Sequence, residues 1–210
     1  MINIKEIIPY LKILRIDHWF KNILVIFGII IAYNFSDIFY LNLSSFVNIC
    51  IGLVSTCLIA SSNYIINEYL DRSYDKFHPE KNRRPGAKNS LKRNIVLFLY
   101  SIFLIIGLYL ANKINYYFLL TQIFFLISGF TYNVKPFRFK DILILDIISE
   151  SINSPIRLLL GWFLVFETSL PPISVVLSFW TFGAFLMTVK RLAELNRLRE
   201  KKVNVGKYRK

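Results

Sequence analysis

The chain has 210 residues, of which 55% are hydrophobic and 16% aromatic, and its mean hydropathy is +0.47. The apolar residues form long blocks, which is typical of membrane-spanning segments and argues against a soluble domain. The formal net charge of +13 comes from basic residues between these blocks. This placement fits anionic lipid headgroups and phosphorylated substrates and argues against nucleic-acid binding.

Residues 1–18 are predicted to form an amphipathic helix that lies on the membrane surface. The segment lacks the small-residue cleavage site of a signal peptide. Its apolar residues recur at helical spacing on one side: Ile4, Ile7, Ile8, Leu11 and Leu14.

Six membrane-spanning helices are predicted after this segment, so the fold class is all-α and integral to the membrane, with one domain over residues 1–210. The predicted spans are 23–40, 46–66, 95–110, 116–132, 142–166 and 173–188.

The basic residues predict the topology of these spans. Apart from Lys113 and Arg157, the 26 Lys and Arg lie in the N-terminal segment, in 72–93, in 135–140 and from Lys190 onward. Alternate loops are therefore basic, which is the positive-inside pattern. It predicts a multi-pass protein of the inner (plasma) membrane with both termini in the cytoplasm.

Acidic side chains emerge from the second predicted span on one helix face. At about 100° per residue, Glu68, Asp71 and Asp75 fall within about 60° of one another, beside Asn67. Like charges one turn apart repel, so helix stability does not favour this stripe. Magnesium does, because it binds one or two carboxylates and completes its octahedron with water and phosphate oxygens. The stripe therefore predicts a Mg²⁺ site at the cytoplasmic face.

Basic residues follow the acidic stripe. His78-Pro79 is predicted to end the helix and turn the chain back. Lys81, Arg83 and Arg84 would then reach phosphate oxygens, for which Arg offers a bidentate fork. The alternative is a solvated, charged loop that only enforces topology.

A second polar cluster begins after the fourth predicted span. Its first part comprises Tyr132, Lys135, Arg138, Lys140 and Asp141. Its second part lies on one face of the fifth span and comprises Asp146, Glu150, Asn153 and Arg157. Ionisable groups at that depth must face the protein interior or a wet cavity. Both acidic stripes start at the same membrane face, so we expect them to clamp one diphosphate. The alternative is a structural pair of Glu150 with Arg157 that joins helices.

These two clusters resemble the signature of the UbiA superfamily of intramembrane prenyltransferases. The family's first motif, Asn-Asp-x-x-Asp-x-x-x-Asp, is similar to Asn67, Glu68, Asp71 and Asp75. Its second motif is similar to Tyr132, Lys140, Asp141, Asp146 and Glu150. The resemblance extends over essentially the whole chain. It implies a UbiA-like helix bundle that transfers a polyprenyl group from a prenyl diphosphate to an acceptor and releases diphosphate.

The resemblance also implies roles for these residues. One Mg²⁺ is expected at Asn67, Glu68, Asp71 and Asp75, and another at Asp141, Asp146 and Glu150. The expected cations at the departing diphosphate are Lys81, Arg84, Arg138 and Lys140. Catalytic roles are expected for Asp71, Asp75, Tyr132, Lys140 and Asp146, and further substrate contacts for Lys21, Asn67, Asn153 and Arg157.

Three further segments resemble the decaprenyl-phosphate phosphoribosyltransferase branch. They are Arg15 with Trp19-Phe20-Lys21-Asn22, His78-Pro79-Glu80-Lys81 leading to Arg84-Pro85, and Lys190-Arg191 with Glu194. In that branch a polyprenyl phosphate attacks phosphoribosyl diphosphate, so diphosphate leaves the sugar. Two features depart from the expected patterns: Glu68 replaces the family's usual Asp, and 149–155 is more polar than in this branch.

The family usually has about nine spans, which at about 20 residues each, with their loops, need a longer chain. We therefore expect a bundle without its C-terminal part: a fragment, a truncated product or one part of an oligomer. The expected partners are a polyprenyl phosphate or diphosphate lipid, a second substrate and membrane lipids. An inactive subunit and a cation transporter are further alternatives; a transporter would carry acidic residues at mid-bilayer and toward both faces.

Overall fold

The computed structural model describes residues 4–36, 42–78, 80–88 and 91–200. Within these ranges the chain forms helices and no strand, so the all-α prediction is confirmed. The α-helices are α1 (Ile4–Ile13), α2 (Ile23–Asn34), α3 (Leu43–Asp75), α4 (Arg93–Asn112), α5 (Tyr116–Asn133), α6 (Leu143–Ser151), α7 (Asn153–Trp162) and α8 (Ile173–Glu200). Short 3₁₀ helices are η1 (Ile16–Asn22), η2 (Lys81–Arg83) and η3 (Phe139–Asp141).

Four helical stretches of the described ranges are long and apolar enough to cross a membrane. They are Glu6–Asn34, Leu43–Asp75, Arg93–Asn112 and Ile173–Arg197. The protein is thus an integral membrane protein. Three predicted spans lie within α3, α4 and α8, and a fourth lies within the 18 residues of α5. The first begins with α2, which ends at Asn34, and residues 37–40 of that span lie outside the described ranges.

The prediction of one continuous helix over 142–166 is wrong. The chain turns at Ile152, between α6 and α7, and α7 ends at Trp162. Pro155 gives the physical reason, because it has no N–H to donate and its ring collides with the carbonyl of the residue four positions earlier, Ser151. Near the start of α7, where the first N–H groups have no helical partner, a proline is tolerated.

The N-terminal segment is shorter as an α-helix than predicted. The α-helix stops at Ile13, and residues 16–22 continue as the 3₁₀ helix η1. Ile7, Ile8 and Leu11 are exposed, whereas Leu14 is buried against the bundle. The exposed apolar side chains fit a membrane-surface helix.

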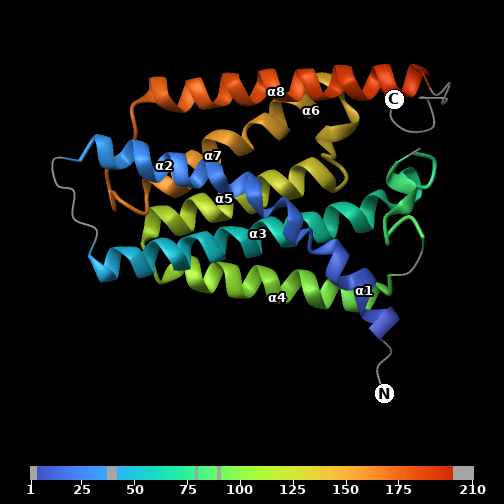
Figure 1. Cartoon of the computed structure of the whole chain (residues 1–210), viewed down its shortest axis with the longest axis horizontal. Coiled ribbons are helices and arrows are strands. Elements are labelled where there is room, and N and C mark those ends of the chain that lie inside the picture. Colours follow the sequence, from blue (N-terminus) through green and yellow to red (C-terminus); the bar gives the residue numbers. More distant parts are fainter. Residues whose placement is uncertain (1–3, 37–41, 79, 89–90, 201–210) are drawn as a thin grey trace.

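The helices pack so that the charged segments gather at one end of the bundle. α3 packs against α4 and α5, and α7 packs against α2, α5 and α8. In Figure 1, α1, the end of α3 with η2, and the C-terminal end of α8 all lie at the right-hand end. The end of α2, the start of α3 and the connections from α4 to α5 and from α7 to α8 lie at the other end. The basic segments that the sequence analysis assigned to one side of the membrane therefore lie at the same end of the bundle.

Two glycines set the contact between α2 and α7. A Cβ at Gly28 would lie 2.3 Å from the Leu158 carbonyl oxygen, and one at Gly161 would lie 2.0 Å from that of Val25. No side chain fits in such a contact, so the helix backbones approach each other as in small-residue membrane interfaces.

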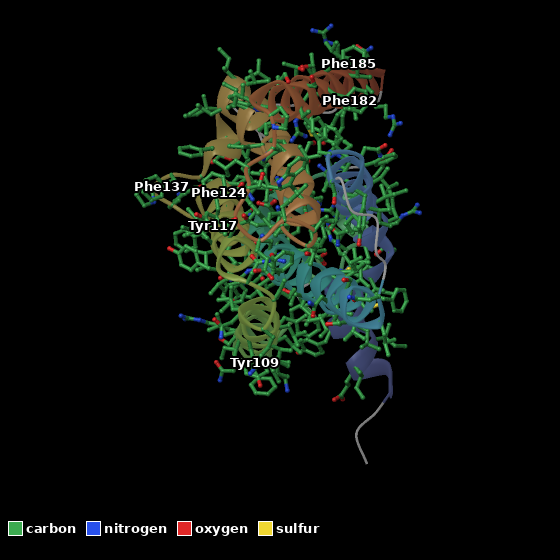
Figure 2. All side chains as sticks on the ribbon, turned by 90° about the vertical axis from the view of Figure 1, so that its left-hand side faces the viewer. Tyr109, Tyr117, Phe124, Phe137, Phe182 and Phe185 are labelled. Atoms are coloured by element: carbon green, nitrogen blue, oxygen red, sulfur yellow. The ribbon has the colours of Figure 1, made fainter. Side chains whose placement is uncertain are left out.

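Large aromatic side chains project from the outside of the bundle. Figure 2 shows Tyr109, Phe124, Phe182 and Phe185 at its periphery, on α4, α5 and α8. Each is at least 47% exposed. In a membrane protein, such a surface is covered by lipid.

Candidate functional site

A cavity of about 500 Å³ opens at the charged end of the bundle. The end of α3 and the loop after it form one wall, and α8 forms the facing wall. The side chains of its lining come from η1 and its preceding residue, α3, the loop, α5, α6 and α8: Arg15, His18, Lys21, Tyr64, Asn67, Asp71, Asp75, His78, Glu80, Lys81, Arg84, Tyr132, Glu150, Lys190, Arg191, Ala193, Glu194 and Arg197. The cavity thus combines carboxylates with many cations.

The acidic stripe of α3 divides between two environments. Asn67, Asp71 and Asp75 line the cavity, because they lie one turn apart on the same helix face. Glu68 is buried elsewhere: its carboxylate accepts hydrogen bonds from Nε and Nη2 of Arg15, at 3.2 and 3.0 Å. It also accepts one from the Gly86 backbone N–H at 3.3 Å. Glu68 therefore fixes the N-terminal segment and the loop to α3.

We expect the E68Q substitution to lower the free energy of unfolding by about 2 kcal/mol, because a buried charge-assisted hydrogen bond becomes a neutral one. Unfolding of the purified protein in detergent measures this change. The exposed E6Q substitution serves as the matched control. If Glu68 instead binds metal, E68Q will weaken Mn²⁺ binding without destabilising the protein.

Basic side chains hold both Asp71 and Asp75 in place. Oδ1 of Asp71 lies 3.0 Å from Nη2 of Arg138 and 2.6 Å from Nζ of Lys140. Arg138 and Lys140 are buried and do not line the cavity, so they position Asp71 and stabilise its negative charge. Asp75 accepts a 2.8 Å hydrogen bond from Arg84, which does line the cavity.

Two arginines that hold the acidic stripe have unusual backbone angles. Arg15 and Arg138 have φ values of 49° and 33°, in the left-handed region that residues with a Cβ rarely adopt. These arginines bind Glu68 and Asp71, respectively. Strain of this kind persists where surrounding contacts compensate for it, often near functional sites.

The second acidic cluster meets α8. Asp146 is buried, and it accepts hydrogen bonds from Tyr132 and Arg191. Glu150 reaches the cavity wall and pairs with Lys190 and Arg191, each at 2.8 Å. Asp141 lies outside the cavity, where Arg138 donates to it at 2.8 Å.

A second cavity of about 340 Å³ adjoins the first and is mainly apolar. Asn153 and Arg157 lie in its lining, with apolar residues of α2, α5 and α8. Nε of Arg157 donates to Asn22 at 3.0 Å, and its guanidinium lies 4.9 Å from the ring centroid of Phe125. The alternative prediction of a structural pair between Arg157 and Glu150 is therefore wrong, because Glu150 pairs with Lys190 and Arg191 of α8 instead.

The loop after α3 is tied to α8 through His78. Its Nδ1 accepts from the backbone N–H of Glu80 and of Lys81, at 3.1 Å each, and its Nε2 lies 3.4 Å from Glu194. Burial, and then the charge of Lys81, lower the pKa of His78, so the neutral ring keeps Nδ1 as an acceptor. Lys81 also binds Glu194 directly at 2.7 Å.

Several cavity residues had no predicted role. Tyr64 lies one turn before Asn67, and its helical spacing from the acidic stripe was the available signal. Lys190, Arg191 and Glu194 were noted only for a branch resemblance, and their place opposite α3 depends on how α8 packs. The sequence carries no direct signal for that packing.

The partners that the carboxylates already have decide which of their oxygens could bind Mg²⁺. No group of three or more His, Cys, Asp or Glu in the described ranges is arranged to hold a metal ion. Hydrogen bonds within these ranges use Oδ1 of Asp71 and Oδ2 of Asp75, which leaves the other oxygen of each. With Asn67 and phosphate oxygens these suffice for Mg²⁺, which takes few protein ligands.

Fold and site together define an integral membrane helix bundle whose charged cavity opens at one end and continues into an apolar one. The model of the UbiA prenyltransferase family matches residues 22–204, and the chain belongs to this family. The resemblance seen in the sequence is thus confirmed.

Individual relatives are longer than this chain. It is 26% identical to the nodulation protein NoeC of Azorhizobium caulinodans over 195 residues, which are 90% of this chain and 58% of that protein. A UbiA homolog from Archaeoglobus fulgidus bound to GPP and Mg²⁺ has a TM-score of 0.74 and 20% identity, over 93% of this chain and 66% of its own. The same homolog bound to DMAPP and Mg²⁺ has a TM-score of 0.73 and 20% identity, over 92% of this chain and 66% of its own. These structures share the fold.

Proposed function

We propose that the protein is a Mg²⁺-dependent transferase that moves a polyprenyl group from a prenyl diphosphate to an acceptor and releases diphosphate. One observation carries this proposal: the charged cavity and the apolar cavity adjoin. Their linings share Lys21, Tyr64, Asn67, Tyr132 and Glu150. An amphiphile with an anionic headgroup and an apolar chain matches this pair of cavities.

In the proposed reaction, Asn67, Asp71 and Asp75 would hold Mg²⁺, which supplies charge stabilisation at the leaving oxygen. Lys21, Lys81 and Arg84 line the charged cavity and neutralise the diphosphate. The bond between C1 of the prenyl chain and the diphosphate oxygen breaks, and its electron pair leaves with the diphosphate. The acceptor forms the new bond to that carbon and loses a proton.

Two tyrosines lie where the cavities adjoin. Tyr64 and Tyr132 contribute to both linings. Lys140 lies 5.8 Å from the Tyr132 ring centroid, and Lys21 lies at the same distance from that of Tyr64. Ring faces that attract ammonium groups would also stabilise the positive charge that develops on an allylic carbon.

The proposed site lies at the cytoplasmic face of the inner membrane, with both termini on that side. The support is that the cavity opens at the end where the basic loops gather. The positive-inside pattern assigns this end to the cytoplasm.

A second candidate function is transfer of phosphoribose from phosphoribosyl diphosphate to a polyprenyl phosphate. Three segments that resemble the phosphoribosyltransferase branch all reach the charged cavity: Arg15 with Lys21, His78 with Lys81 and Arg84, and Lys190 with Arg191 and Glu194. The contact between Lys81 and Glu194 joins two of these segments. Such a convergence favours a ligand with several phosphate groups.

A donor assay distinguishes the two reactions. Membranes that contain the chain are incubated with Mg²⁺ and a prenyl diphosphate labelled in its chain, or with labelled phosphoribosyl diphosphate and a polyprenyl phosphate. We expect transfer of label from the prenyl diphosphate to an acceptor in the membranes, at a rate above that of membranes without the chain. Lipid-linked label from the second donor alone supports phosphoribosyl transfer. Consumption of neither donor contradicts both proposals.

A further inference from the structure

The second acidic cluster is closed by an arginine from α8. The guanidinium of Arg191 donates to both oxygens of Asp146, through Nε to Oδ2 and through Nη2 to Oδ1. Nη2 also donates to Oε2 of Glu150 at 2.8 Å. Nη1 donates to Glu194 at 2.8 Å, which fixes the orientation of the guanidinium plane. One side chain thus bridges both acids of the cluster.

The remaining carboxylate oxygens of the cluster also have partners. Oε1 of Glu150 accepts from Lys190 at 2.8 Å. The Tyr132 hydroxyl lies 2.7 Å from Oδ1 of Asp146 and 3.2 Å from Oε2 of Glu150. All four carboxylate oxygens therefore already have partners. Asp71 and Asp75 differ, because each keeps one oxygen outside the hydrogen bonds of the described ranges.

Because the cluster is buried, a metal ion cannot easily replace the guanidinium of Arg191. Asp146 is 2% exposed and Arg191 9% exposed. A divalent cation at Asp146 and Glu150 would have to displace the guanidinium or lie against it. Like charges at such a distance and at low local dielectric repel strongly. These acids therefore do not fit a second Mg²⁺ as the sequence led us to expect.

We propose that the chain binds a single divalent cation, at Asn67, Asp71 and Asp75, and that Arg191 occupies the position of a second cation. The proposal rests on the proposed function, since it assigns the cations of the same site. Arg191 and Lys190 line the charged cavity on the α8 side. They face the diphosphate from the wall opposite α3, and neutralise the leaving group with fixed charges in place of a second metal ion.

The test counts bound Mn²⁺ per chain, in the presence of inorganic diphosphate, on the full chain in lipid nanodiscs. We expect one Mn²⁺ for the wild type and two for R191Q, because the substitution releases oxygens of Asp146 and Glu150. The R72Q substitution makes the same chemical change at an exposed position of α3 outside the cavity, and should leave the count at one. R191K keeps a cation and should also bind one.

A second pair of variants removes the dependence on R191Q folding well. D146N should still bind one Mn²⁺, whereas D75N should lose it. Two Mn²⁺ per wild-type chain, with one lost in D146N, would overturn the single-cation proposal and leave the proposed function intact. No bound Mn²⁺ in the wild type would contradict the metal dependence of the proposed function itself.

Discussion

Substituting Asp71 or Asp75 by Asn should lower the turnover of the prenyl diphosphate donor by about a hundredfold or more. Both carboxylates line the charged cavity, and each keeps an oxygen for a cation. Loss of a ligand to a metal that stabilises the leaving oxygen costs several kcal/mol of barrier, and about 1.4 kcal/mol corresponds to each factor of ten. Turnover with saturating Mg²⁺, normalised to the amount of folded protein, measures the effect.

The matched control for these variants is E167Q. Glu167 is exposed in the connection between α7 and α8, at the end of the bundle away from the cavity. The E167Q substitution also changes a carboxylate to an amide, and it should leave turnover unchanged. If D71N and D75N retain near-normal turnover while their expression matches the wild type, the metal role of these carboxylates is wrong.

Substituting Gly161 by Leu should destabilise the bundle by more than about 3 kcal/mol, at the upper end of overpacking effects. The backbones of α2 and α7 meet at this point, and even a Cβ would lie 2.0 Å from the Val25 carbonyl oxygen. Backbone atoms cannot rotate aside as side chains do, so the two helices must separate. Separation would also move Arg157 of α7 away from Asn22, to which it donates a hydrogen bond.

The unfolding midpoint in detergent and the fraction of monodisperse protein measure this effect. T181L is the matched control, since it adds a similar bulk at an exposed position of α8. G161A should fall between the wild type and G161L, because it adds only the first carbon. An unfolding midpoint of G161L equal to that of the wild type would show that the α2–α7 contact is not as close as described.

In the proposed chemistry, the two walls of the charged cavity have different roles. The wall from α3 would supply carboxylates to the metal ion, and Lys140 behind this wall holds Asp71 in place. The wall from α8 supplies fixed cations, of which Arg191 is tied down by acids of α6. In the proposed reaction both walls bind the diphosphate, so segments far apart in the sequence carry the proposed site.

The sequence by itself determined the helical membrane class, the family and a stripe of Asn67, Glu68, Asp71 and Asp75, of which all but Glu68 line the cavity. These depend on composition, motif spacing and the fixed period of a helix, which are local properties. Pro155 was a local signal for the break before it, because proline acts on its own backbone, but the predicted span over 142–166 ran through it. Only the tertiary structure decided that Glu68 turns to Arg15 and that Arg191 closes the second acidic cluster. Partners 53 and 45 residues apart meet through helix packing. Such packing depends on the whole set of interhelical contacts, so no local pattern predicts it.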